Sequence, residues 1–301
     1  MQDLDEFTVT DAALAQMAGT ADPRLREIMD AAVRHLHAFA REVNLTPAEW
    51  LNGIRFLTEV GHACTPLRQE FILLSDVLGL SAVVNALHDK TAQENGTQSS
   101  LLGPFFREHA PEFALGDCIV AEPGAPEIVL RGQVTDAQGA PIPGATIGVW
   151  QTDAAGQYDL QAHDHDRMDM RGNFTCDAHG RYHFRTVRPL GYSIPLDGPV
   201  GAMVRRQNRH GMRPAHIHFL IAAAGFRELV TALYFGDDDN IASDTVFGVS
   251  NSLVVRFAAD DLDSPIPGLR SVRYDFQLGH ARADGDGRVG VDPASLVAAA
   301  E

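Results

Sequence analysis

Arg213-Pro214-Ala215-His216-Ile217-His218-Phe219 contains two histidines two residues apart, with an apolar residue between them and another just after. Successive side chains of a β-strand point to opposite faces, so His216 and His218 would project together while Ile217 and Phe219 pack behind. Neutral imidazole is the commonest metal ligand in proteins, and a strand would fix both rings. Two ordinary polar positions on a half-buried strand explain the segment equally simply, and for an isolated pair that is the more common case.

The alternating pattern extends over the chain that follows Gly103-Pro104-Phe105-Phe106. Short apolar runs are separated by turn residues, and Asp177-Ala178-His179-Gly180 is typical of a hairpin. Several strands at this spacing without intervening helices predict a β-sandwich or barrel. The expected strands are 128–134, 145–150, a run around Phe174, 181–186, 215–222, 228–235, 252–257 and 270–276.

The first hundred residues have helical periodicity instead. Apolar residues recur at close to 3.6-residue intervals over 23–43. Thr46-Pro47-Ala48-Glu49 fits a capping box that opens a second helix. Two more helices are expected at 66–78 and 81–87, with a break near Gly79. We therefore predict an α+β fold in which a helical domain, 1–102, precedes a β-sandwich domain, 103–301.

Composition excludes several classes of protein. The chain has 301 residues, 45% of them apolar and 21% charged, which is ordinary for a soluble protein. No run approaches the roughly 18 apolar residues of a membrane helix, and the acidic N-terminus lacks the features of a signal peptide. Cys64, Cys118 and Cys176 are odd in number and far apart, so no disulfide framework is expected. These features predict a cytoplasmic protein without membrane insertion.

The formal net charge of −16, without a long basic stripe, makes nucleic-acid binding improbable. Arginines do gather directly before the histidine pair, at Arg205, Arg206, Arg209 and Arg213. A positive pocket on an acidic protein would suit a small anionic ligand. Loop arginines that pair with surface carboxylates are the alternative.

Two other segments could be taken for metal sites. His163-Asp164-His165-Asp166 offers four potential ligands in a row, but contiguous side chains diverge in an extended chain, and a solvated loop is the better interpretation. Asp284-Gly285-Asp286-Gly287 lacks the later oxygen ligands of a calcium loop, and we reject that interpretation.

Two tyrosines upstream of the histidine pair closely follow glycines at the ends of predicted strands. They lie in Gly156-Gln157-Tyr158-Asp159 and Gly191-Tyr192-Ser193-Ile194-Pro195. Either one alone would more often be a buried tyrosine hydrogen-bonded at a sheet edge. Together, Tyr158, Tyr192, His216 and His218 have the order, spacing and flanking residues of the intradiol ring-cleaving dioxygenases. The chain resembles that family from the helical block through Arg256.

The resemblance implies a non-haem Fe(III) site with Tyr158 and His218 as equatorial ligands and Tyr192 and His216 as axial ligands. Phenol has an unperturbed pKa of about 10, so phenolate ligation fits a strong Lewis acid such as ferric iron. The family analogy makes Tyr192 the base that accepts a substrate proton, and it places Arg213 beside the substrate. A structural salt bridge is the alternative role for Arg213.

Within the family, the segments 68–76, 102–105, 192–201 and 244–249 are most similar to hydroxyquinol 1,2-dioxygenases. That similarity implies cleavage of hydroxyquinol, benzene-1,2,4-triol, with O2 to 3-hydroxy-cis,cis-muconate or maleylacetate. Asp76 could accept a hydrogen bond from the third hydroxyl, which catechol lacks; a helix cap is its alternative role. The implied substrate contacts are Leu73, Asp76, Gly103, Pro104, Phe105, Ile194, Pro195, Arg213 and Val246.

The resemblance further implies a homodimer formed through the helical domain, with a phospholipid as a candidate ligand at the dimer interface. One position departs from the family pattern, since Ala232 stands where many members carry glutamine. The alternatives to the hydroxyquinol assignment are a catechol or chlorocatechol 1,2-dioxygenase, a non-catalytic β-sandwich binding module, and a zinc hydrolase that uses His216 and His218.

Overall fold

The computed structural model describes residues 4–65, 68–92, 96–121, 126–161, 167–258 and 264–281, without the side chains of 88 and 90–92. The chain divides into two compact units, Met1–His62 and Ala63–Glu301. The boundary between these compact units lies earlier in the chain than the domain boundary predicted after residue 102. The predicted domain boundary stays a prediction. The segments 163–166 and 284–287, considered above as metal sites, lie outside the described residues.

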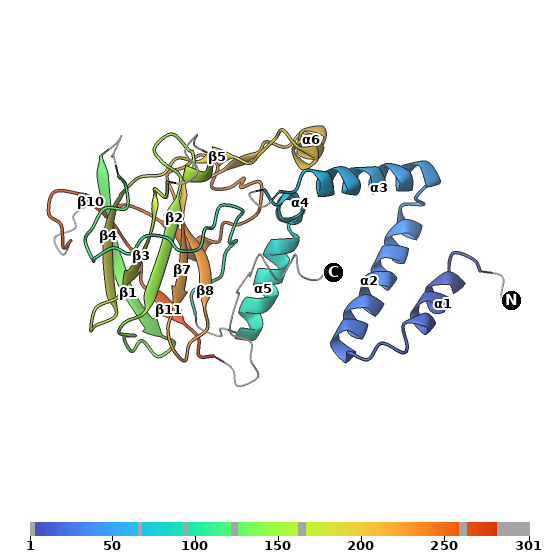
Figure 1. Cartoon of the computed structure of the whole chain (residues 1–301), viewed down its shortest axis with the longest axis horizontal. Coiled ribbons are helices and arrows are strands. Elements are labelled where there is room, and N and C mark those ends of the chain that lie inside the picture. The colour runs from blue at the N-terminus through green and yellow to red at the C-terminus, as the bar shows by residue number, and fades with distance from the viewer. Residues whose placement is uncertain are drawn as a thin grey trace. The chain divides into compact units, whose positions relative to one another are not determined.

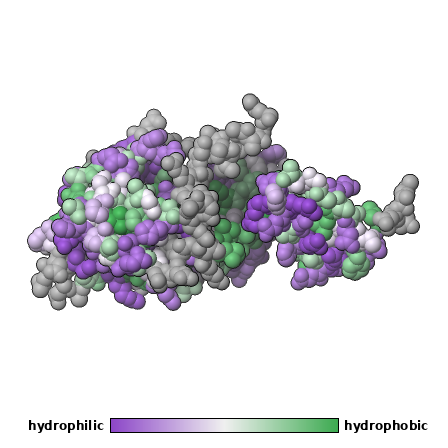
Figure 2. All heavy atoms as spheres, turned by 90° about the horizontal axis from the view of Figure 1, so that it is seen from below, coloured by the Kyte–Doolittle hydropathy of each residue, from purple (hydrophilic) through white to green (hydrophobic). Residues whose placement is uncertain are grey.

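The first unit consists of α1 (Thr8–Gln16), α2 (Pro23–Glu42) and α3 (Pro47–His62). The predicted capping box opens α3: the Thr46 backbone N–H donates to Glu49 Oε2 at 2.9 Å, and the Glu49 N–H donates to Thr46 Oγ1 at 3.3 Å. None of the side chains of α2 is buried. Its apolar residues therefore reach the surface of this unit, where Figure 2 shows green patches between purple ones.

The second unit begins with α4 (Glu70–Val77) and α5 (Leu80–Ala92), and it also contains α6 (Pro199–Arg206). Gly79, with a φ of +75°, separates α4 from α5 as expected, because glycine tolerates the left-handed region. The helix α6 was not predicted from the sequence, although Pro199 at its start is a helix signal.

The helices of the described residues include no single one that is long and apolar enough to cross a membrane. Glu70–Val77 and Leu80–Leu87 meet the length and composition criteria only as a pair bent by 75°.

The described strands of the second unit form two larger sheets and one two-stranded sheet, which pairs β5 (Tyr192–Ser193) with β6 (Met212–Arg213) (Figure 1). In one larger sheet, β1 (Glu127–Asp136) pairs antiparallel with β4 (Arg181–Val187) and parallel with β10 (Arg270–Arg273) and β11 (Phe276–Leu278). The other larger sheet has the order β3-β2-β7-β8-β9. Its strands are β3 (Arg171–Thr175), β2 (Thr146–Gln151), β7 (His216–Ala222), β8 (Leu229–Phe235) and β9 (Val254–Val255).

Aromatic side chains from both sheets fill the space between them. The ring centroid of Phe184 on β4 lies 5.0 Å from that of Phe174 on β3 and 6.4 Å from that of Phe219 on β7. Phe219 in turn lies 5.0 Å from Phe276 on β11. Rings at these separations pack in contact, so the two sheets share one apolar core. The predicted fold class, helices followed by a β-sandwich, is confirmed.

Two details of the strand prediction were wrong. The turn at 177–180 is tight, with the Gly180 N–H donating to the Asp177 carbonyl at 3.0 Å, but it is not a hairpin. It joins β3 to β4, which belong to different sheets because the apolar sides of both strands face the shared core. The expected strand at 252–257 is largely absent, since the 3-10 helix η2 (Asn251–Leu253) precedes only the two-residue β9.

Candidate active site

The histidine pair lies on β7, in the middle of the five-stranded sheet. His216 and His218 are both almost fully buried, and so is the opposite face of the strand, which carries Ile217 and Phe219. The strand is thus buried on both faces, which differs from the half-buried strand of the simplest interpretation. Trp150 pairs with His218 in the register, and its indole stacks on the imidazole with the ring centroids 4.9 Å apart and the planes at 4°.

A separate pair of short strands brings Tyr192 close to His216 and His218. It lies on β5 (Tyr192–Ser193), which pairs with β6 (Met212–Arg213) so that Tyr192 is directly opposite Arg213. Arg213 Nη1 donates to Tyr192 Oη at 3.4 Å and contacts His216 Nε2 at 3.2 Å. The two-residue β5–β6 ladder therefore brings Tyr192 to the histidine strand, although 24 positions separate Tyr192 from His216.

Tyr158 completes the cluster from the loop before η1 (Asp159–Gln161). It is almost fully buried. Its ring stacks on Phe105 at a centroid distance of 4.3 Å and meets the Tyr192 ring edge-on at 5.4 Å. The structure thus brings together all four residues that the family resemblance implies as ligands.

Burial sets the protonation of these four groups. It lowers the pKa values of His216 and His218 well below the ordinary value, and the charge of Arg213 adds to this effect. It raises the pKa of Tyr158 well above the usual value, with a further contribution from Tyr192, and it also raises that of Tyr192 against the opposing charge of Arg213. Without a bound cation the cluster therefore holds two neutral imidazoles and two neutral phenols.

The donor atoms fit a metal ion. His216 Nδ1 lies 2.7 Å from the Pro214 carbonyl, which can only accept, so Nδ1 carries the proton and the Nε2 lone pair is available. That lone pair faces His218 Nε2 at 3.1 Å. The buried Tyr158 hydroxyl makes no hydrogen bond of ordinary geometry, although Tyr192 is close enough to affect its pKa. The orphaned buried hydroxyl of Tyr158, the neighbouring Tyr192 and the two imidazole nitrogens 3.1 Å apart supply the oxygen and nitrogen donors that such a cation requires.

In the part of the chain that the structure describes, carboxylates and thiolates do not contribute to such a site. Within the described ranges, no group of three or more histidine, cysteine, aspartate and glutamate side chains could hold a metal ion. The candidate centre is therefore of mixed imidazole and phenol character, which suits a strongly Lewis-acidic ion better than zinc or calcium.

Arg213 is the charged group of the cluster, and it is buried with a counter-ion. Its Nε donates to Asp244 Oδ1 at 3.2 Å, and its Nη2 donates to Asp244 Oδ2 at 3.4 Å and to Tyr234 Oη at 3.2 Å. Burial is the largest single effect and lowers the pKa of Arg213, but Asp244, Tyr192 and Tyr234 together outweigh it and hold the pKa well above the ordinary value. Arg213 thus has the salt bridge that was its alternative role and also contacts two of the implied ligands.

The other arginines of this cluster do not join the site. Arg205 and Arg206 are exposed in the last turn of α6. Arg209 donates to the backbone carbonyls of Val77 and Thr245, at 2.8 and 2.7 Å. Of these arginines, the structure places only Arg213 among the four candidate ligands. The arginine cluster in the sequence therefore predicted more positive charge at the site than the structure places there.

The implied substrate contacts are placed as follows. Gly103 has a φ of +73°, and a Cβ added there would lie 3.5 Å from His218 Cε1, so the backbone itself lies against the imidazole. Asp76 is buried near Arg213 and Asp244, whose charges act on its pKa. The Val246 N–H donates to Asp244 Oδ1 at 3.4 Å. Leu73, Phe105 and Ile194 are buried, whereas Pro104 and Pro195 are partly exposed.

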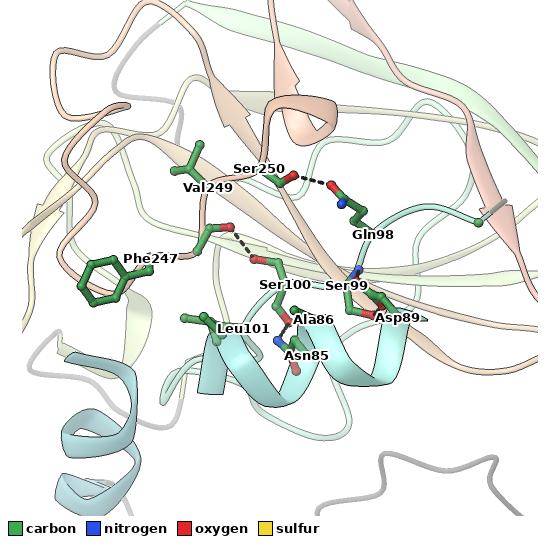
Figure 3. Close-up of a pocket in the computed structure, with 13 residues that line it drawn as sticks. Asn85, Ala86, Asp89, Gln98, Ser99, Ser100, Leu101, Phe247, Val249 and Ser250 are labelled. Carbon is green, nitrogen blue, oxygen red and sulfur yellow. Dashed lines mark hydrogen bonds between the residues drawn. The ribbon is translucent and has the colours of Figure 1, made fainter. Parts of the chain in front are cut away.

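A cavity of about 500 Å³ lies beside this cluster but contains none of the four candidate ligands (Figure 3). Ser100 lines it, and the Ser100 hydroxyl also contacts Tyr234 Oη at 2.9 Å. Across the cavity wall, Asn85 Nδ2 donates to the Ser100 carbonyl at 3.0 Å, and the Ser99 hydroxyl donates to Asp89 at 2.7 Å. We place the candidate active site at the four donor side chains and not at this cavity, because, of the described residues in these two places, only those side chains could bind a metal ion. Ligands that converge on one ion leave little empty space around them.

Several residues that hold the site were not predicted from the sequence. Tyr234 and Asp244 contact Arg213, and Trp150 stacks on His218. The alternation of β8 puts Tyr234 on the same face as Ala232, which pairs with His218, so strand periodicity could have identified Tyr234. Asp244 follows no such period, and no local signal indicates its partner.

Comparison with known proteins gives the family. A model described as "Catechol dioxygenase N terminus" matches residues 22–96, and one described as "Dioxygenase" matches residues 102–280. The hydroxyquinol 1,2-dioxygenase of Rhodococcus opacus is 45% identical over 268 residues, which cover 89% of each chain. This chain belongs to the intradiol ring-cleavage dioxygenase family.

Two further relatives agree with that assignment. The catechol 1,2-dioxygenase of Candida albicans is 36% identical over 273 residues, covering 89% of this chain and 90% of the yeast protein. The crystal structure of hydroxyquinol 1,2-dioxygenase from Pseudomonas putida DLL-E4 has a TM-score of 0.83 and 41% identity, and the match covers 92% of this chain and 99% of that one. The chain is thus an intradiol ring-cleaving enzyme, which disfavours a non-catalytic module and a zinc hydrolase.

Next to Tyr158, a buried ion pair fixes the loop that carries it. Arg171 is almost fully buried and makes two hydrogen bonds to the Asp159 carboxylate, one of them from Nε at 2.7 Å. Its Nη1 donates to the Phe105 carbonyl at 3.2 Å. One guanidinium thus holds both Phe105 and the residue after Tyr158.

We expect Asp159→Asn to lower the free energy of unfolding by ~3 kcal/mol, because it leaves the buried charge of Arg171 without its counter-ion. Urea denaturation of the iron-free protein measures the loss. Asp237→Asn is the matched control, since Asp237 pairs with Arg188 at 2.8 Å with its side chain 60% exposed. There the expected loss is below ~1 kcal/mol, and equal losses in the two variants would contradict the prediction.

Proposed function

We propose that this chain is a non-haem Fe(III) dioxygenase that cleaves hydroxyquinol with O2 to 3-hydroxy-cis,cis-muconate, the tautomer of maleylacetate. The observation that carries the proposal is the convergence of two buried imidazoles and two buried phenols beside Arg213, with the carboxylate of Asp76 close enough to feel its charge. The similarity to hydroxyquinol enzymes from Rhodococcus and Pseudomonas supports the choice of substrate.

In this proposal Tyr158, Tyr192, His216 and His218 hold the iron. The two histidines are kept neutral by burial, which is the form that binds a metal. The chemistry of ferric iron, when it is bound, is to lower the pKa values of the phenols and of the diol and to activate the diol toward O2. The hydrophobic rings of Phe105 and Trp150 pack against Tyr158 and His218, and they exclude water from this chemistry.

Tyr192 Oη is the atom that accepts the proton of a diol hydroxyl. Burial favours the neutral form of Tyr192, which supports proton uptake by its phenolate from the diol. Arg213 Nη1, 3.4 Å away, stabilises negative charge at the neighbouring oxygen atoms without itself losing a proton. Arg213 therefore acts as a fixed positive charge and Tyr192 as the proton acceptor.

Asp76 selects the substrate in this proposal. The buried Asp76 carboxylate, which already accepts a hydrogen bond from Ser81, accepts a further one from the third hydroxyl of hydroxyquinol, and catechol would lack that bond at a cost of ~1–3 kcal/mol. A catechol 1,2-dioxygenase is the second candidate. It is less well supported, because the Candida catechol enzyme is less similar to this chain than the Rhodococcus hydroxyquinol enzyme.

Assembly belongs to the same proposal. The helix α2 buries none of its residues, and Leu25, Ile28, Leu36 and Phe39 stand exposed on it. An amphipathic helix with an uncovered apolar face supports a homodimer formed through the helical unit. A phospholipid at the interface and a cytoplasmic location stay predictions.

Oxygen uptake with a panel of diols tests the substrate. The purified iron-loaded protein is expected to have a kcat/KM at least tenfold higher for hydroxyquinol than for catechol or 4-chlorocatechol, with a product whose absorbance matches that of maleylacetate. A higher kcat/KM for catechol would reject hydroxyquinol as the substrate and leave the dioxygenase activity standing.

The metal ligands are tested by a pair of buried tyrosines. Tyr158→Phe removes a phenolate, so iron per chain is expected to fall severalfold and the red-brown tyrosinate-to-iron absorption band to weaken. Tyr182→Phe is the control, because Tyr182 is also buried but donates to the Tyr274 carbonyl at 2.8 Å, outside the cluster. The ligand assignment fails if both variants bind iron as the wild type does.

Asp76→Asn tests substrate selection and has a defined pH signature. Burial is the main cause that raises the pKa of Asp76, so the folded chain binds more protons than the unfolded one and loses stability as pH rises past the ordinary carboxyl value. The neutral amide is expected to raise the thermal midpoint at pH 7, with a gain that shrinks toward pH 4. It should also reduce the preference for hydroxyquinol over catechol by about tenfold.

Asp237→Asn is the control for this effect. A hydrogen bond from Arg188 lowers the pKa of Asp237, so its stabilising contribution is present at neutral pH and lost as pH falls. This variant should therefore lower the thermal midpoint at pH 7, by little because the side chain is exposed, and leave the substrate preference alone. An unchanged preference in Asp76→Asn would remove Asp76 from the substrate site.

A further inference from the structure

The hydrogen bonds of Arg213 divide its guanidinium into two parts. Nη1 faces the candidate ligands, at 3.4 Å from Tyr192 Oη and 3.2 Å from His216 Nε2. Nε and Nη2 face away from them, toward Asp244 and Tyr234. Only Nη1 is directed at the reacting groups. The hydrogen bonds of Nε and Nη2 therefore determine where Nη1 points.

Tyr234 is placed for this task by the sheet. It lies on β8 directly opposite His216, it is fully buried, and its ring centroid is 5.3 Å from that of His216. Its phenolic hydroxyl can donate one hydrogen bond and also accept. The hydroxyl contacts both Arg213 Nη2, at 3.2 Å, and Ser100 Oγ, at 2.9 Å.

The direction of this chain of hydrogen bonds follows from its two ends. Ser100 Oγ lies 3.2 Å from the Gly248 carbonyl, which can only accept, so the Ser100 hydroxyl donates there (Figure 3). Ser100 must then accept from Tyr234, because its single proton is used. The Tyr234 oxygen is left to accept from Arg213 Nη2, which can only donate. Every proton in the series from Arg213 through Tyr234 and Ser100 to Gly248 therefore has one fixed position.

Gly248 packs closely against the residues of this hydrogen-bond network. Its N–H donates to Asp244 Oδ2 at 3.0 Å, and a Cβ added to it would lie 2.6 Å from Tyr234 Oη and 2.9 Å from Arg213 Nη2. The loop between Asp244 and Gly248 thus wraps the guanidinium with its backbone as well as with a carboxylate. No side chain larger than hydrogen fits at this position without moving Tyr234 or Arg213.

We propose that Tyr234 and Ser100 are positioning residues of the ring-cleavage reaction, which hold Arg213 Nη2 so that Nη1 stays directed at Tyr192 and the bound diol. This inference rests on the proposed function, since it assumes that Arg213 acts on the diol. Tyr234 takes this role on the strand face where Ala232, opposite His218, offers no polar group. Ser100 connects the same network to the wall of the neighbouring cavity.

The decisive variant is Tyr234→Phe, with Tyr274→Phe as its matched control. Tyr274 packs against the same small apolar cluster, but its hydroxyl donates to the Ser252 carbonyl at 3.1 Å and has no contact with Arg213 among the described interactions. We expect kcat per bound iron to fall about tenfold in Tyr234→Phe and less than twofold in Tyr274→Phe. Iron content and the anaerobic dissociation constant of the diol should change less than threefold in both.

A purely structural role for Tyr234 gives a different result. Thermal midpoint and iron content would then fall together while kcat per bound iron stayed within twofold of the wild type, and that outcome would overturn the proposal. If Tyr234→Phe does not fold, Ser100→Ala is used to test the same proposal. It should lower kcat per bound iron about threefold, and Ser100→Thr, which keeps the hydroxyl, should restore it; equal values for the two Ser100 variants would also overturn the proposal.

A second measurement does not depend on turnover. In the iron-free protein, the Arg213 Nε–H resonance, assigned by its loss in Arg213→Lys, should exchange with solvent at least tenfold faster in Tyr234→Phe than in the wild type or in Tyr274→Phe. An unchanged exchange rate would count against the positioning role. The failure of hydroxyquinol as the wild-type substrate would instead be seen in the diol panel, and the variants would then be compared on the diol that is cleaved.

Discussion

The buried ion pair between Arg213 and Asp244 is the interaction on which the rest of the site depends. Removing two charges from water costs several kcal/mol for each ion, and that cost is offset only when the remaining hydrogen-bonding groups are also satisfied. Here Tyr234, Tyr192 and the backbone of the loop at 244–248 satisfy them. The positive charge can therefore remain in a dry environment among four neutral side chains, where its influence is much greater than it would be in water.

This charge explains why the donor residues have their chemical types. Arg213 and burial both lower the pKa values of the two histidines, which keeps them available as neutral ligands. Burial opposes ionisation of the two phenols while Arg213 favours it, so their ionisation is left to a bound cation. One arginine thus favours, in all four candidate ligands, the form that would bind the proposed metal.

Much of the fold could be predicted from local patterns, because those patterns reflect local physics. The capping box before α3, the break at Gly79 and the strand alternation of β7 each involve neighbours in the sequence, and the structure has all three. The interpretation of Asp177–Gly180 as a hairpin failed because a turn determines only its own geometry, whereas the sheet that each flanking strand joins depends on distant residues. The partners of Arg213 lie 21 and 31 positions away for the same reason. The four candidate ligands came from a family resemblance and could not have been assembled from spacing alone.

The turn at Gly103 has a consequence for how this enzyme could acquire new substrates. One wall beside His218 is bare peptide backbone in a conformation that disfavours any other residue. Mutation cannot reshape that wall by exchanging one side chain for another. Variation in ring specificity is therefore expected at other proposed contacts, such as Leu73 and Asp76 on α4, whose side chains ordinary substitutions can change. The fold thereby separates a surface that evolution can vary from one that it must keep.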